Sequence, residues 1–162
     1  MKNKIGLSTI IATLLTIMLL MIVTAIVWSF VNKTVTDKTK QTSSCLNLFD
    51  KIKFNNDYTC YDANAKTVHF SVEIADVTVD SVVVAISSAS SKSFTITNTA
   101  QTISGLTNYP DGSTSIILPG KNSGKTYIAS GFNEQPDSLK IAPIIDGQQC
   151  DITGTVNNID TC

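Results

Sequence analysis

The chain has 162 residues, a formal net charge of −1 and 43% hydrophobic residues. Its twelve basic side chains are all lysines and are distributed unevenly: residues 1–40 carry a net charge of +4, whereas residues 41–162 carry −5. This acidic part without arginine argues against nucleic acid as a partner, because phosphate recognition needs a basic face. Its length suits a single domain with one core.

The first predicted element is a long apolar helix. Residues 5–32 contain no charged side chain, and Lys2 and Lys4 stand immediately before them. At ~1.5 Å per residue this segment makes a helix of about 42 Å, longer than the ~30 Å hydrocarbon core of a bilayer. A removable signal peptide has about 7–15 apolar residues and a small-residue cleavage site, whereas this segment ends in bulky residues such as Trp28 and Phe30. We therefore expect a helix that enters the membrane and is kept.

The junction between the lysines and the apolar segment carries a more specific signal. The run KIGLST at residues 4–9 resembles the class III signal peptide of archaeal type IV pilins, in which a short basic leader ends in glycine ahead of the helix. The family usually has a charged residue before the glycine, where this chain has Ile5. Bacterial type IV pilins carry a glutamate at the fifth mature position, where this chain has Ile11. Its absence points away from a bacterial pilin and is normal for archaeal ones. The resemblance implies cytoplasmic cleavage after Gly6, with Leu7 as the new N-terminus.

The same resemblance implies an assembly and its partners. In archaeal type IV pilins a prepilin peptidase removes the leader, and a pilus assembly machinery moves the helix from the membrane into a filament of identical subunits. By resemblance, a bundle of helices would form the core of a cell-surface filament, and the outer domain would serve adhesion. Minor pseudopilins and archaellins share the signal. A single-pass anchored binding domain, by contrast, needs the apolar helix without the leader.

One face of the predicted helix is small and weakly polar. Its threonines fall within an arc of about 80° when residues are spaced at 100°; they are Thr9, Thr13, Thr16 and Thr24. Helices in lipid associate through close approach at small residues and through interhelical hydrogen bonds. We interpret these threonines as a helix-packing face. The alternative is that their hydroxyls bond back to carbonyls of their own helix.

A polar stretch, residues 33–44, follows the apolar segment. It is rich in Thr, Ser and Lys, and since threonine is a modest helix former, it predicts one or two further turns and then a linker. Asn32 begins the only Asn-x-Ser/Thr sequon and is the candidate glycosylation site. Its position at the membrane exit leaves a glycosylating enzyme little room, which favours an unmodified asparagine. The predicted boundaries are a leader at 1–6, a helix and stalk at 7–40, and an outer domain at 45–162.

All four cysteines, Cys45, Cys60, Cys150 and Cys162, follow the apolar segment. Their even number predicts disulfides in an oxidising compartment, which places the outer domain outside the cytoplasm. Short loops favour the pairs Cys45–Cys60 and Cys150–Cys162, since closing a loop of about 15 residues contributes ~3 kcal/mol. The alternative joins the two ends of the domain, for example Cys60 to Cys150. The sequence has no Cys-x-x-Cys pair, the spacing that is typical of a structural zinc site, so we do not predict one.

From Cys45 onward the hydrophobic period changes to two. In residues 67–74 apolar side chains alternate with Thr67, His69, Ser71 and Glu73, which predicts a half-buried strand with its polar side in water. Similar segments lie at 46–54, 80–86, 93–97, 113–118, 126–130, 139–145 and 151–156, with turn signals at 55–57, 109–112, 119–122 and 146–147. The predicted fold class is α+β overall, a long N-terminal hydrophobic helix followed by an all-β, immunoglobulin-like antiparallel sandwich.

Catalytic chemistry has little support in the sequence. His69 is the only histidine, and no serine lies in a Gly-x-Ser-x-Gly turn. The run GKNSGKT at 120–126 has one residue too few between its glycines for a phosphate loop. Asp76 and Asp80 lack the run of oxygen ligands that a calcium loop uses. We predict no catalytic, cofactor or metal site, and therefore a structural protein.

Overall fold

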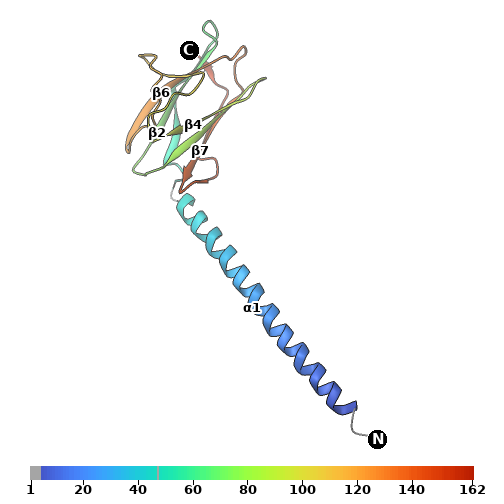
Figure 1. Ribbon diagram of the computed structural model, residues 1–162. Coiled ribbons are helices and arrows are strands. Elements are labelled where there is room, and N and C mark those ends of the chain that lie inside the picture. Colours follow the sequence, from blue (N-terminus) through green and yellow to red (C-terminus); the bar gives the residue numbers. More distant parts are fainter. Residues whose placement is uncertain (1–4, 47) are drawn as a thin grey trace. The chain divides into compact units, whose positions relative to one another are not determined.

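The computed structural model describes residues 5–46 and 48–162 (Figure 1). Within these residues one helix, α1 (Ile5–Leu46), is followed by ten strands in two largely antiparallel sheets, so the predicted α+β class is confirmed. The immunoglobulin-like type stays a prediction. The chain divides into two compact units between Thr42 and Ser43. We call the second unit, Ser43–Cys162, the β-domain.

The helix α1 continues further than the sequence pattern predicts. The predicted linker at 33–44 is helical, and α1 ends only at Leu46. The reason is that this stretch contains neither Gly nor Pro, and threonine costs only a few tenths of a kcal/mol per residue in a helix. Thr34 also bonds back to the Phe30 carbonyl at 3.0 Å, which satisfies its hydroxyl within the helix.

The first sheet has the strand order β10-β1-β2-β6-β5. Its strands are β1 (Ile52–Asp62), β2 (Thr67–Ile74), β5 (Leu106–Asn108), β6 (Ser123–Ser130) and β10 (Asp160–Thr161). All pairs are antiparallel except β1 with β10, which brings Asp160 beside Cys60. The C-terminal strand thereby reaches the strand that begins the domain.

The second sheet has the order β4-β3-β7-β8, and β9 also pairs with β7. Its strands are β3 (Ser81–Ser87), β4 (Lys92–Thr97), β7 (Ser138–Ile145), β8 (Gln148–Gln149) and β9 (Gly154–Asn157). The turn between β7 and β8 is Asp146-Gly147, and both residues have positive φ. This pair suits the two-residue hairpin that the sequence predicts at 146–147.

Apolar side chains of both sheets form one core. The alternation predicted for β2 is confirmed, because Val68, Phe70, Val72 and Ile74 are all buried. The Phe70 ring lies 5.5 Å from the Tyr127 ring, in the range of favourable aromatic pairs. Tyr127 is fully buried, and its hydroxyl donates to the Ile117 carbonyl at 2.7 Å. Burial raises the pKa of the Tyr127 phenol, so the donor proton is retained.

Several predicted strands and turns differ from the observed ones. The strand predicted at 46–54 begins only at Ile52, because α1 continues to Leu46 and a turn follows, and the strand predicted at 151–156 begins at Gly154. Residues 113–118 form no strand and contribute a single bridge, between Gln101 and Ile116. The Asn108 amide donates to the Ser115 carbonyl at 2.9 Å and helps to hold this segment as a loop, although Ile116 is buried. The turn predicted at 55–57 lies inside β1, where the register shifts between Asn55 and Cys60. A β-bulge takes up the extra residues there.

The four cysteines form two disulfides, but the preferred pairing was wrong. Cys45 is bonded to Cys150, and Cys60 to Cys162, with Cα–Cα distances of 5.5 and 5.0 Å. The pairing of β10 with β1 brings the last residue to Cys60, because the Cys162 N–H donates to the Tyr61 carbonyl at 3.0 Å, whereas Cys150 directly follows β8 in the second sheet. Each bond joins the N-terminal to the C-terminal part of the β-domain, as the alternative pattern proposes with other partners.

Candidate functional site

The exposed apolar surface of α1 is the first candidate site. Residues 10–36 meet the length and composition of a membrane-crossing helix, and none of this surface is buried in the chain. At ~1.5 Å per residue these 27 residues extend about 40 Å. A contiguous apolar surface of this size needs lipid or another protein.

The threonines on this helix satisfy their hydroxyls locally. Thr13 donates to the Ile10 carbonyl at 2.9 Å, Thr16 to the Thr13 carbonyl at 2.8 Å, and Thr24 to the Met21 carbonyl at 2.9 Å. This is the alternative geometry that the sequence leaves open. Because the hydroxyls are bonded, the face can enter an apolar environment without an unsatisfied donor. The side chain of Thr9 lies outside the part that the structure describes.

The residues at the two ends of the apolar segment lie within α1. Gly6 and Leu7, the predicted cleavage position, are in its first turn. Lys2 and Lys4 lie outside the described residues. Asn32, the candidate glycosylation site, is exposed but helical, whereas such sequons usually function in surface loops.

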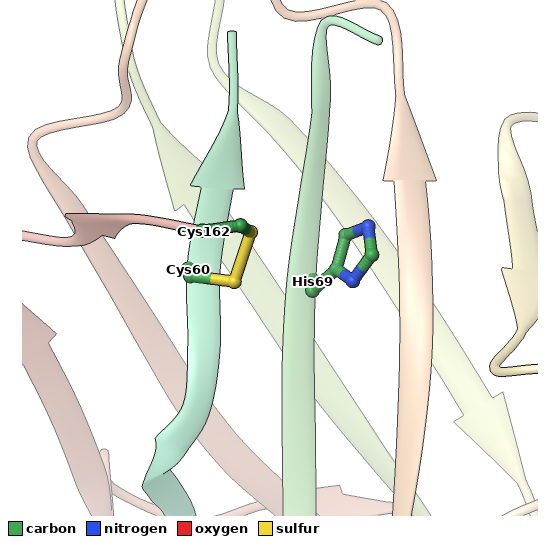
Figure 2. A group of neighbouring side chains, drawn as sticks. All are labelled: Cys60, His69 and Cys162. Atoms are coloured by element: carbon green, nitrogen blue, oxygen red, sulfur yellow. A yellow bond between two sulfur atoms is a disulfide. The ribbon is translucent and has the colours of Figure 1, made fainter. Parts of the chain in front are cut away.

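A second cluster contains the only histidine of the chain. Figure 2 shows His69 on β2 beside the Cys60–Cys162 disulfide, and the ligand atoms of these three residues lie within 4.8 Å of one another. Zinc binds cysteine as thiolate, and two sulfurs bonded to each other offer none. The imidazole instead packs against the Tyr109 ring, with centroids 5.6 Å apart. In the disulfide-bonded chain this cluster therefore serves packing.

The polar face of β2 is more enclosed than the alternating pattern predicts. Ser71 is buried and His69 is half-buried. The bulge of β1 lies beside Ser71, whose backbone N–H donates to the Thr59 hydroxyl at 3.5 Å, and Tyr109 packs on His69. Neither covering group is visible in the sequence, because the bulge and the turn after β5 are set by tertiary pairing.

The hairpin between β1 and β2 is closed by a carboxylate. Asp62 accepts hydrogen bonds from the backbone N–H groups of Asn64 at 2.8 Å and Ala65 at 3.0 Å. These bonds lower the pKa of the Asp62 carboxyl below its ordinary value of 3.8, and the bond from Ala65 has the larger effect. The side chain acts as a local turn stabiliser in its ionised form.

No protein-family model, curated protein or solved structure matches this chain. What can be said of its location therefore rests on its own sequence and structure. The apolar helix near the N-terminus indicates membrane anchoring or a signal segment, and the two disulfides indicate an extracellular location for the β-domain.

Proposed function

We propose that this chain is the structural subunit of an extracellular filament of the archaeal type IV pilus kind. The observation that carries the proposal is an apolar segment, uncharged over residues 5–32 and unburied over residues 10–36, at the start of which a basic stretch ends in Gly6. A plain membrane anchor needs the apolar surface but not the leader. The role proposed is structural rather than catalytic.

The proposed occupant of the α1 surface in the mature state is a set of α1 helices from identical chains. Lipid covers the segment first, with the leader on the cytoplasmic side. After cleavage between Gly6 and Leu7, each helix exchanges lipid for neighbouring helices. A head-to-tail contact that does not close produces an open helical filament. The assembly needs a prepilin peptidase and a pilus assembly machinery as partners.

The composition of α1 supports helices as the neighbours. In lipid, association draws on close packing at small residues rather than on the hydrophobic effect. Thr13, Thr16 and Thr24 supply a narrow face whose hydroxyls are already bonded within the helix. The β-domain completes its own core and holds it with two disulfides, which suits a module exposed on the outside of a filament.

A second candidate is a single-pass anchored domain that binds a ligand while it remains in the membrane. The same helix supports it, since 27 residues are enough to span a bilayer. A third candidate, a minor pseudopilin, is also a filament subunit. It differs from the main proposal only in its abundance in the filament.

The N-terminus of the mature native protein tests the proposal. Intact mass and N-terminal sequencing are expected to give a chain that begins at Leu7, and negative-stain images are expected to show filaments. Gly6→Leu should block cleavage and leave a membrane-bound precursor, whereas the neighbouring change Ser8→Ala should be processed. A mature chain that still begins at Met1 or Lys2 would contradict the pilin hypothesis and favour the anchored domain.

A further inference from the structure

The outward face of the first sheet carries an open hollow of about 400 Å³. It crosses β1, β2 and β6 and is lined by Asn55, Tyr58, Ser71, Glu73, Tyr109, Gly124, Lys125 and Thr126. We call it the tyrosine hollow. Its volume lies in the range of sites for small molecules, which is about 300–1,000 Å³.

Two exposed tyrosines line this hollow. Tyr58 lies in the β1 bulge and is 62% exposed, and Tyr109 follows β5 and is 51% exposed. Tyr109 is held in place, because its backbone N–H donates to the Thr126 carbonyl at 3.0 Å and its ring packs on His69. Tyr61 and Tyr127 are buried, so both exposed tyrosines of the chain lie at this one site. Aromatic rings left in water beside a hollow are a mark of recognition.

The polar groups at the hollow are fixed before any ligand arrives. Asn55 Nδ2 donates to Glu73 Oε1 at 2.6 Å, and Asn55 Oδ1 accepts from the Asp57 backbone N–H at 3.0 Å. Lys53 Nζ lies 3.9 Å from the other carboxylate oxygen of Glu73. A carboxylate accepts about four hydrogen bonds, so Glu73 keeps capacity for a ligand's donors. Such preorganisation lowers the entropy lost on binding.

The space between these groups depends on a glycine. Gly124 pairs with Glu73 in the sheet register, and a Cβ built on Gly124 would lie 3.4 Å from Glu73 Cγ and 3.5 Å from the Val72 carbonyl oxygen. These are ordinary contacts, and the backbone of Gly124 is not left-handed. A branched side chain at this position would therefore reduce the hollow without straining the strand.

We propose that the tyrosine hollow binds a saccharide. A pyranose ring has an apolar C–H face that packs on an aromatic ring, and hydroxyl groups that donate to a carboxylate and to amide oxygens. Tyr58 and Tyr109 supply the rings, and Glu73 with Asn55 supplies the polar partners. The lining combines aromatic rings with polar groups, which disfavours a purely apolar ligand. This inference does not rest on the proposed filament, although in a filament it would supply the adhesive contact.

The test uses the full chain, unassembled, in a polyoxyethylene detergent, because glucoside and maltoside detergents carry sugars and phosphocholine detergents carry a quaternary ammonium group. Cellotriose, chitotriose and mannotriose are titrated separately and followed by NMR chemical shifts. At least one should bind saturably with a dissociation constant on the order of 1 mM or tighter. Tyr109→Ala and Gly124→Val should each weaken that binding at least about tenfold, a loss of ~1.4 kcal/mol.

Matched variants separate binding from folding. Tyr58→Phe keeps the ring and should bind within about threefold of the unchanged chain, whereas Tyr58→Ala should not. Glu134→Gln removes an exposed carboxylate away from the hollow and should bind normally, in contrast to Glu73→Gln. Every variant is checked by near-UV circular dichroism. The proposal would be overturned if none of the three sugars bound saturably, or if the variants at the tyrosine hollow bound as well as the control variants. Binding of tetramethylammonium in place of sugars would overturn it too.

Discussion

The helix and the β-domain use the same apolar residue types in opposite ways. Phe30 on α1 is 73% exposed, whereas Phe70 on β2 is fully buried. The difference lies in the pattern, since residues 5–32 are mostly apolar with no charged side chain, whereas apolar residues alternate with polar ones in β2. The β-domain completes its core by itself, and the helix leaves its apolar surface to lipid or to other chains. Four predictions, from the largest expected effect to the smallest, test this contrast.

The largest effect is expected from a charge on the threonine face of α1. Thr13→Lys places an ammonium group where lipid or neighbouring helices should lie, at a cost of several kcal/mol. We expect no filaments by negative-stain electron microscopy. Thr36→Lys, at the polar end of the apolar segment, is the matched control and should still assemble. Normal filament yield from Thr13→Lys would show that this face does not line the core.

A deletion in the β-domain core should come next. Phe70→Ala removes a fully buried ring and should lower the free energy of unfolding of the β-domain by about 3–5 kcal/mol. Phe30→Ala should leave that free energy unchanged, because Phe30 lies on α1. Trp28, the only tryptophan, is also on α1, so near-UV circular dichroism of the tyrosines is the suitable probe. Equal losses in both variants would contradict two separately stabilised units.

Each disulfide should contribute somewhat less to the free energy of unfolding of the β-domain than the buried Phe70 ring does. Both close loops of just over 100 residues. Cys60→Ser with Cys162→Ser should lower the free energy of unfolding by about 2–5 kcal/mol, measured by urea titration. Non-reducing peptide mapping of the unchanged chain should link Cys45 to Cys150. A Cys45–Cys60 peptide would restore the short-loop pairing and contradict the strand topology.

The smallest effect concerns the β1–β2 hairpin. Because folding lowers the pKa of Asp62, its contribution to stability is present above the ordinary value of 3.8 and is lost as the pH falls through the folded pKa. Thermal unfolding should therefore lose more stability on acidification in the unchanged chain than in Asp62→Ala. Parallel pH profiles for the two proteins would show that the hydrogen bonds from Asn64 and Ala65 do not favour the ionised form.

Local patterns carried some predictions and could not carry others. The uncharged run predicted α1, and the alternation predicted β2, because both depend on neighbouring residues only. The disulfide pairing depends on β10 returning to β1, which brings Cys162 beside Cys60. No spacing in the sequence encodes that return. The immunoglobulin-like type of the sheets stays a prediction.

The candidate sites divide in the same way. The proposed leader, the threonine face and the sequon are visible in the sequence, since each is a short contiguous or periodic motif. The tyrosine hollow is not, because Tyr58 and Tyr109 are far apart in the chain. A bulge in β1 and the pairing of β5 with β6 bring them to one face of the sheet.

Cryo-electron microscopy of filaments isolated from the native source tests the central claim most directly. The account predicts a subunit that begins at Leu7, a central bundle that contains the apolar segment of α1, and β-domains on the outside. A native protein found only as a monomer in the membrane would contradict it. A filament whose core is built from β-domains instead of α1 would contradict it equally.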